Sequence, residues 1–346
     1  MRRWIPGLAL LTSYERAWLS KDLVAGLVLT ALLVPQGMAY AELAGLPAIT
    51  GLYTTILCLI GYAAFGPSRI LVLGPDSSLG PMIAATILPL VGADGDPAKA
   101  IALASMLALL VGLFAIILGL AKLGLIADLL SKPTQIGYMN GLALTILVGQ
   151  LPKLFGFSID SDTFLGDVAG FVRGVADGET VPAALAIGVF ALALIFVCTR
   201  FLPKVPGVLV AVVASIVVAT VFDAAAHDVS LVGVLPEGFP PLTWPGVAWS
   251  DLGLLVAGAL GITLVSLTDT ISTSSAFAAR SGDTVDANQE MIGIGAANVA
   301  AGFFQGFPVS TSSSRTAVAT QTGSKSQLTG LVGAGAITLL LLFANG

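Results

Sequence analysis

Apolar stretches long enough to cross a lipid bilayer constrain this chain more than any other feature. A spanning helix needs roughly 17 to 25 predominantly apolar residues. Stretches of about this length occur near 23–41, 48–65, 98–121, 125–151, 181–199, 206–222, 252–273, 288–304 and 327–343. Only 10% of the residues are charged, whereas a soluble domain has roughly 25%. The sequence therefore predicts an all-α polytopic membrane protein.

Two further apolar segments, 78–91 and 311–322, are too short to cross a hydrocarbon core of about 30 Å at about 1.5 Å per residue. Each follows an apolar run that ends in proline, ILVLGP at 70–75 and FFQGFP at 303–308. Proline favours extended backbone in the residue before it and fits the first turn of a helix. We expect two half-helices, opening near Pro75 and Pro308 and preceded by short extended strands.

The interruptions recur at matching positions in two parts of the chain. Pro75 lies 39 residues after Gln36, which interrupts the first helix, and Pro308 lies 39 residues after Asp269, which interrupts the eighth. Matching interruptions are typical of inverted repeats in transporters. The pattern predicts a cytoplasmic interfacial segment at 1–22 and a first repeat of segments 1–7 at 23–222. An extracellular connection at 223–251 and an incomplete second repeat of segments 8–11 at 252–346 follow. A complete second repeat would need roughly three more helices.

The distribution of basic residues predicts the orientation in the membrane. If the N-terminus is cytoplasmic and the chain crosses the membrane eleven times, most of the acidic loops lie on the extracellular side. The basic residues of the connections on that side are only Lys99, Lys153 and Arg173. Cytoplasmic connections carry the excess of lysine and arginine in membrane proteins. We therefore expect a multi-pass protein of the inner or plasma membrane with its N-terminus in the cytoplasm.

The starts of the two half-helices are the candidate site. Their first backbone N–H groups have no acceptor within the helix and carry a partial positive charge, so two facing ends form an anion trap. Hydroxyl groups follow each break, at Ser77 and Ser78 in the first and from Ser310 to Ser314 in the second. The alternative reading is that these serines only cap helices. The candidate substrate-binding hydroxyls are Ser77, Ser78, Thr311, Ser312 and Ser314.

Three charged residues remain within the membrane region. Arg315 is the one basic residue there, and it either binds an anion or forms a structural ion pair with Asp76 or Asp269. Asp269 could carry a coupled proton or help to hold Na⁺. Asp76 stands at the start of a half-helix, where a carboxylate would compete with an anionic substrate, so we expect it to cap the helix.

Gln36 and Tyr40 complete the candidate binding residues. Gln36 lies between Pro35 and Gly37, where the helical hydrogen-bond ladder is weakened, and its amide could donate to a substrate. Tyr40 lies four residues later on the same helical face. Packing or an interfacial position is the alternative for Tyr40.

The sequence shows no pattern typical of a disulfide framework, a metal site or an enzymatic site. Cys58 and Cys198 lie in apolar runs, and the single histidine, His227, has no partner residues nearby. No nucleophile–base pair or metal-ligand set is visible. We expect no cofactor, no metal, no enzymatic activity and no nucleic-acid partner.

The chain resembles the SulP anion transporters, also called solute carrier family 26. The resemblance rests on VPQGMAYAELAGLP at 34–47, GLYTT at 51–55 with FGPSR at 65–69, LGPDSS at 73–78, and DANQEMIGIGAANVAAGFFQGFPVSTSSSRTA at 286–317. The resemblance implies a seven-plus-seven inverted repeat like that of the uracil permeases, with a core domain that moves against a gate domain. It also implies a cytoplasmic STAS domain and a homodimer in full-length members.

By the same resemblance, substrate binds between the starts of the third and tenth segments. Gln36 and Tyr40 match first-segment binding positions, Ser312, Ser314 and Arg315 match tenth-segment positions, and Asp269 matches an eighth-segment acid. The function implied is elevator-type secondary active transport (symport) of a small anion, sulfate above all, coupled to H⁺ or Na⁺. A nucleobase/cation symporter of the same fold and an anion channel are the alternatives.

Overall fold

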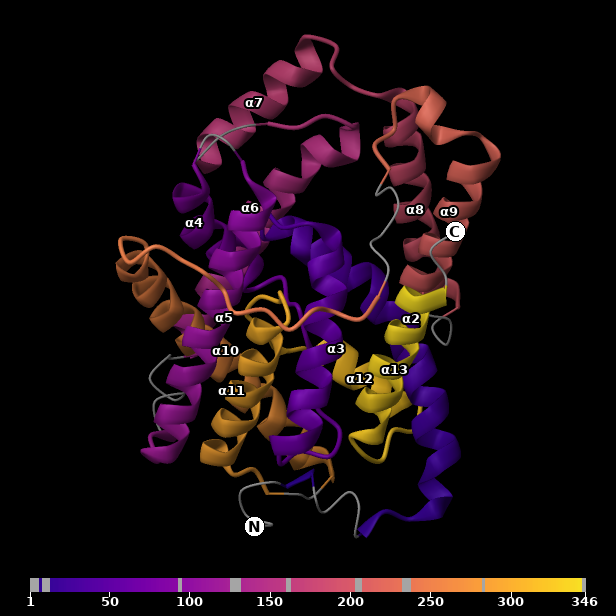
Figure 1. Cartoon of the computed structure of the whole chain (residues 1–346). Helices are drawn as coiled ribbons and strands as arrows, with labels where there is room; N and C mark the ends of the chain where they lie inside the picture. Colours follow the sequence, from indigo (N-terminus) through magenta and orange to yellow (C-terminus); the bar gives the residue numbers. More distant parts are fainter. Residues whose placement is uncertain are drawn as a thin grey trace. The chain divides into compact units, whose positions relative to one another are not determined.

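Helices make up nearly all the regular structure of the chain in the computed structural model, shown in Figure 1. The structure describes residues 6–7, 13–92, 95–124, 132–159, 163–202, 207–231, 238–281 and 284–343. Its elements are η1 (Arg16–Trp18), α2 (Leu19–Leu43), α3 (Ala48–Phe65), β1 (Leu73–Gly74), α4 (Gly80–Val91), α5 (Pro97–Leu120), α6 (Lys132–Phe155), α7 (Phe164–Ala176), α8 (Pro182–Phe201), α9 (Gly207–Val221), η3 (Ala224–His227), α10 (Leu252–Ser281), α11 (Ala287–Phe303), β2 (Ser310–Thr311), α12 (Ser313–Gln321) and α13 (Leu328–Phe343).

Each predicted apolar segment corresponds to a helix. The predicted start of one helix at 125–131 lies outside the described residues, as do 1–5 and 8–12 of the N-terminal segment and 232–237 of the connection. Judged by length and composition, five described helices could cross a membrane: Arg16–Leu43, Ala48–Phe65, Pro97–Leu120, Pro182–Phe201 and Leu252–Ala279.

Helix α7 was not predicted, because we expected its residues to belong to a connecting loop. Thr163 caps it by accepting a hydrogen bond from the backbone N–H of Gly166 at 3.1 Å. Leu165 and Val172, which lie on one side of the helix, are exposed, while Phe171 packs edge-on against Phe155. Its apolar face is only 13 residues long, so a search for spanning segments overlooks it.

The described helices belong to two compact units that differ from the predicted repeats. One unit comprises residues 1–131 and 234–346, and the other comprises 132–233. Helices α2–α5 and α10–α13 share the first unit, whereas α6–α9 form the second. Both half-helices and all the candidate binding residues therefore lie in the first unit.

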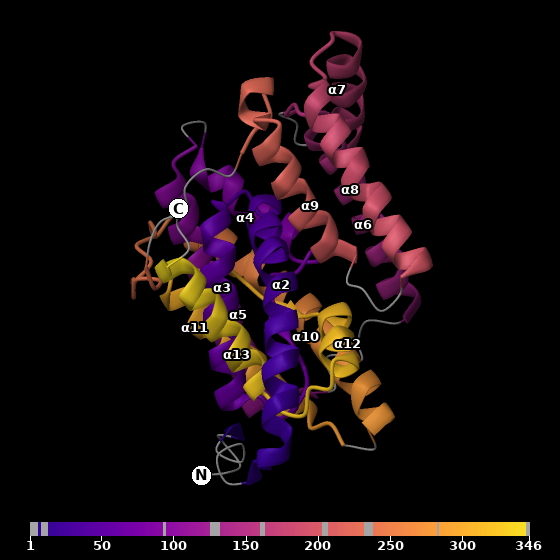
Figure 2. The ribbon, with the colours of Figure 1, turned by 90° about the vertical axis from the view of Figure 1, so that its right-hand side faces the viewer.

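Within the first unit, the packing of the helices has an approximate two-fold relation. Helix α2 packs on α12 and α13, and α10 correspondingly packs on α4 and α5. The pairing of α2 with α13 is visible in Figures 1 and 2. The first helix of each predicted repeat thus contacts the third and fourth helices of the other, as an inverted repeat requires.

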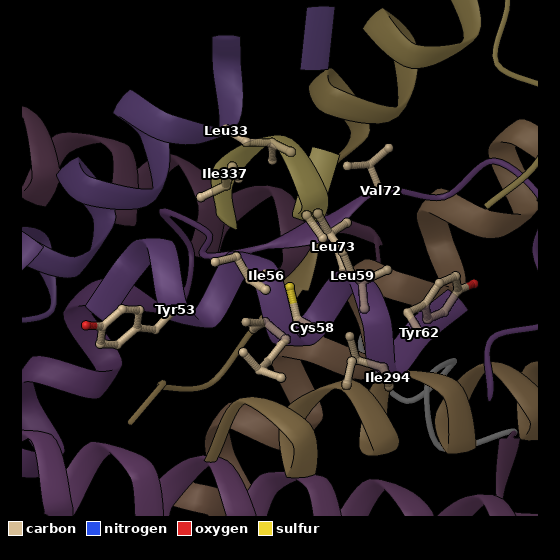
Figure 3. Packing of buried hydrophobic residues seen from close by; sticks show 14 of the residues in the cluster. Leu33, Tyr53, Ile56, Cys58, Leu59, Tyr62, Val72, Leu73, Ile294 and Ile337 are labelled. Atoms are coloured by element: carbon tan, nitrogen blue, oxygen red, sulfur yellow. The ribbon is translucent and has the colours of Figure 1, made fainter. Parts of the chain in front are cut away.

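One of the two hydrophobic cores of this unit surrounds α3. Figure 3 shows side chains from α2, α3, β1, α11 and α13 gathered around Cys58. Helices α2 and α3 approach closely at Gly37 and Gly51, since a Cβ atom on Gly51 would overlap the carbonyl oxygen of Gly37. Small residues allow such close approach of helices in membranes. This crossing holds the part of α2 that carries Gln36.

A buried carboxylate joins α2 to the start of α13. Asp22 has no exposed surface, and its Oδ1 accepts hydrogen bonds from the backbone N–H groups of Lys325 at 2.7 Å and Ser326 at 3.2 Å. Its Oδ2 accepts from the Ser326 hydroxyl at 2.6 Å. Asp22 thus satisfies the backbone N–H groups of the segment that leads into α13, which begins at Leu328.

Candidate functional site

Strands β1 and β2 meet where the two broken segments cross. They pair antiparallel, with Leu73 opposite Thr311 and Gly74 opposite Ser310. Short extended strands were predicted before the half-helices, and the structure contains them. The second lies later than predicted, because Ser310 and Thr311 follow Pro308 instead of preceding it. Helices α4 and α12 accordingly begin at Gly80 and Ser313, five residues beyond the respective prolines.

Side chains satisfy the backbone of these non-helical segments, as a site away from water requires. The backbone N–H of Val309 donates to Asn298 Oδ1 at 2.9 Å, and its carbonyl oxygen accepts from Ser266 Oγ at 3.0 Å. On the first segment, the N–H of Val72 donates to Thr316 Oγ1 at 3.1 Å. Asn298, Ser266 and Thr316 are buried. The two breaks are therefore rigid, pre-formed features.

The serine run at the start of α12 has two parts. Ser312 is the N-cap residue, and its Oγ accepts the backbone N–H of Arg315 at 3.4 Å. Ser314 is exposed and its Oγ lies 3.0 Å from Ser312 Oγ. Ser312 thus caps the helix, as the alternative reading of the serines predicts, while the exposed Ser314 can present its hydroxyl to a ligand.

Helix α10 adds hydroxyls that sequence reasoning missed. Thr273 Oγ1 lies 2.9 Å from Ser313 Oγ, and Thr270 Oγ1 accepts from Thr311 Oγ1 at 3.5 Å. With Ser266 they occur at spacings of four and three residues, which is one helical face. This spacing within VSLTDTIST was the available signal.

The turn before α4 is organised by Asp76. Its Oδ1 accepts from the backbone N–H of Ser78 at 3.0 Å and from Ser78 Oγ at 2.8 Å, while its carbonyl oxygen accepts the N–H of Gly80 at 3.2 Å. This is a capping geometry. Asp76 therefore caps the turn that precedes α4, whereas the N-cap position of the helix itself is occupied by Leu79. Ser77 is half-buried in the same turn.

Ser78 connects the two carboxyl groups. Its Oγ lies 2.8 Å from Asp76 Oδ1 and 3.1 Å from Asp269 Oδ2. A hydroxyl carries a single hydrogen, so Ser78 either donates to one of them or shares the hydrogen between both. A proton on either carboxyl would give each contact a hydrogen of its own.

Arg315 points from α12 back to the first segment. Its side chain is 1% exposed, and Nη2 donates to the carbonyl oxygen of Pro75 at 2.7 Å and pairs with Asp76 Oδ2 at 3.4 Å. Gly74 leaves room for the guanidinium, because a Cβ atom there would overlap Nη1. Of the two ion pairs considered for Arg315, the one with Asp76 is present. Nε and Nη1 are buried and have no hydrogen-bond partner among the described residues.

Gln36 and Tyr40 are half-buried on α2, which packs on both α4 and α12. No hydrogen bond joins either side chain to another described residue. The structure therefore puts their helix beside both half-helices and leaves their polar groups available.

Two cavities, of about 180 and 240 Å³, lie elsewhere in the unit and share the segment Pro67–Arg69. Neither is lined by a predicted binding residue. Groups of metal-binding side chains are likewise not found among the described residues. We identify the candidate site by its hydrogen-bonding groups, since an anion needs donors more than volume.

Comparison with known proteins shows which family the chain is similar to. The profile of the sulfate permease family matches residues 19–346. A probable sulfate transporter of Mycobacterium tuberculosis is 42% identical over 343 residues, covering 99% of this chain and 60% of the relative. Human solute carrier family 26 member 6 is 31% identical, covering 98% of this chain and 47% of the relative. The chain thus spans about half of these relatives' length.

Solved structures have the same fold. The overall structure of SLC26A9 superposes with a TM-score of 0.91 at 25% identity, covering 99% of this chain and 57% of the other. The transmembrane domain of the cyanobacterial bicarbonate transporter BicA superposes with a TM-score of 0.82 at 24% identity, covering 96% and 84%. The predicted all-α membrane fold is confirmed.

Proposed function

This chain belongs to the sulfate permease family, and from that premise we propose that it carries out secondary active transport of a small anion, sulfate above all. The observation that carries the proposal is the crossing of the two breaks beside Ser312, Ser314 and Arg315. These residues offer several donors and a buried positive charge at a helix start. Ser77, Ser78, Thr311, Gln36 and Tyr40 line the same crossing in this proposal.

The division of the helices supports an elevator-type mechanism. The unit that holds the site is compact by itself and contains both half-helices. It could therefore move as one rigid body and carry the substrate with it; rigid-body movement of one helix bundle against another is a general source of alternating access. We further propose a homodimer in the inner or plasma membrane, with the N-terminus in the cytoplasm.

The contacts of Ser78 favour H⁺ over Na⁺ as the coupling ion. A proton on one of the two carboxyls beside Ser78 would give each of the two contacts its own hydrogen. Asp76 already faces Arg315. We assign the coupled proton to Asp269.

Uptake into proteoliposomes by the intact protein tests this function. Sulfate, bicarbonate and a dicarboxylate are compared with and without a pH gradient and a Na⁺ gradient. We expect saturable sulfate uptake that an inward H⁺ gradient stimulates and uracil does not inhibit. Uptake that does not saturate would instead identify a channel, and competition by uracil would identify a nucleobase symporter.

Asp269→Asn tests the coupling assignment. We expect sulfate uptake that no longer responds to the pH gradient. Asp251→Asn, at the start of the same helix and hydrogen-bonded to Ser250, is the matched control and should respond like the unmodified protein. A pH response that persists in Asp269→Asn would refute the assignment.

A further inference from the structure

The ion pair between Arg315 and Asp76 is a feature that anion binding by itself does not explain. It is the one salt bridge within the described part of the chain, and it lies at the proposed binding site. A carboxylate at the start of a half-helix opposes an anionic substrate, because both are attracted to the same N–H groups and the same guanidinium.

The arginine is held independently of this carboxylate. Nη2 donates to the Pro75 carbonyl oxygen at 2.7 Å, whereas its distance to Asp76 Oδ2 is 3.4 Å. Charge-assisted hydrogen bonds are typically about 2.7–2.9 Å long. The carbonyl bond therefore positions the guanidinium, and the longer contact with Asp76 mainly balances its charge.

Asp76 is in turn anchored through its other oxygen. Oδ1 accepts from the N–H and the hydroxyl of Ser78. The Asp76 side chain is 17% exposed, against 1% for Arg315. Oδ2 can thus leave the guanidinium while Oδ1 keeps its hydrogen bonds.

The remaining donors of Arg315 indicate what would replace this oxygen. Nε and Nη1 are buried and have no partner among the described residues. Unpaired donors of a buried charged group are rare and call for an acceptor. A doubly charged oxyanion supplies several acceptor oxygens, whereas Asp76 contributes one.

We propose that Asp76 is a tethered counter-ion, which neutralises Arg315 while no anion is bound and which an anionic substrate must displace. The proposal rests on the proposed function of this site. A tethered group competes at a high effective concentration, so weakly bound monovalent anions are excluded, while a divalent oxyanion gains enough electrostatic attraction to compete. Asp76 is thus a specificity-determining residue that favours sulfate-like substrates over chloride-like ones.

Sulfate binding to the intact protein in detergent, with chloride as competitor, tests the proposal. Asp76→Asn removes the charge and keeps an oxygen that can accept the Ser78 N–H. We expect sulfate to bind about tenfold more tightly, and chloride to compete at lower concentration than in the unmodified protein. Asp76→Ser, which also keeps a capping oxygen, should show the same gain.

Asp286→Asn is the matched control. Asp286, at the start of α11, also accepts a backbone N–H two residues ahead, that of Asn288, at 3.0 Å. Unlike Asp76, it forms no ion pair with an arginine among the described residues. This variant should bind sulfate and chloride like the unmodified protein. In an Arg315→Gln background, Asp76→Asn should give a clearly smaller gain, because Asp76 acts mainly through Arg315.

Failure of the proposed function and failure of the tethered counter-ion give different results. If the unmodified protein binds no anion, the proposed function fails. If it binds sulfate, but a folded Asp76→Asn or Asp76→Ser variant shows no gain in affinity, the tethered counter-ion is refuted and the proposed function stands.

Discussion

At the scale of residues, neighbouring hydroxyls at the start of α12 have different tasks. The Ser312 hydroxyl accepts the N–H of Arg315 and so contributes to the stability of the helix. Ser314 is exposed, and its hydroxyl lies beside that of Ser312. Stability and ligand binding can therefore be separated by mutating positions two residues apart.

Ser312→Ala and Ser314→Ala should differ in this respect. Both should weaken sulfate binding several-fold, since each removes a donor of the proposed site. Only Ser312→Ala should also lower the unfolding temperature, because loss of an N-cap costs about 1 kcal/mol. Binding and thermal unfolding of the purified protein measure the two effects. Unchanged sulfate affinity in Ser314→Ala would remove Ser314 from the site.

At the scale of elements, the crossing of α2 and α3 fixes one wall of the site. Gly51 belongs to GLYTT and Gly37 to VPQG, and neither motif explains by itself why glycine is needed. The structure shows that the two helices touch backbone to backbone at this point. Because Gln36 precedes Gly37, the crossing also determines where its amide lies.

Gly51→Ala should therefore destabilise the protein and weaken sulfate binding. An added methyl group in a closely packed contact costs typically about 1–3 kcal/mol, and moving α2 displaces Gln36. Gly335→Ala, on α13, is the matched control, since apart from the backbone of its own helix a Cβ atom there would meet nothing within 4 Å. That control should be neutral or slightly stabilising, as alanine favours helix. Equal unfolding temperatures for the two variants would contradict the proposed crossing.

At the scale of the whole molecule, the candidate site belongs to one compact unit. Residues far apart in the chain form it, because α2–α5 and α10–α13 pack together while α6–α9 form the other unit. A ligand that binds between β1, β2 and the half-helices should stabilise this unit directly. The second unit supplies none of the predicted binding residues.

Hydrogen exchange of the intact protein can test that arrangement. Saturating sulfate should slow exchange in α4, α12 and the two strands, because bound ligand stabilises the folded site. Amides in α8 and α9 should change less. Slower exchange that is confined to α8 and α9 would place the binding site in the second unit.

The sequence alone determined the membrane fold and the places where helices break. Lipid requires long apolar segments whose backbone is hydrogen-bonded internally, and the segments before Pro75 and Pro308 visibly depart from that pattern. It also singled out Asp269, Asp76 and Arg315, because charge is rare inside a membrane. These signals are local, so they can be read from a window of neighbouring residues.

Only the tertiary structure decided which of these groups are partners. Arg315 and Asp76 are 239 residues apart, and Asp22 and Ser326 are 304 residues apart. Asn298 showed no signal of its role, since an asparagine among small residues does not reveal which backbone it will bind. Such pairings depend on how distant helices pack, and the division into two units depends on it as well. Residue type and spacing predict that a buried polar group needs a partner, whereas the packing of the helices selects which partner it finds.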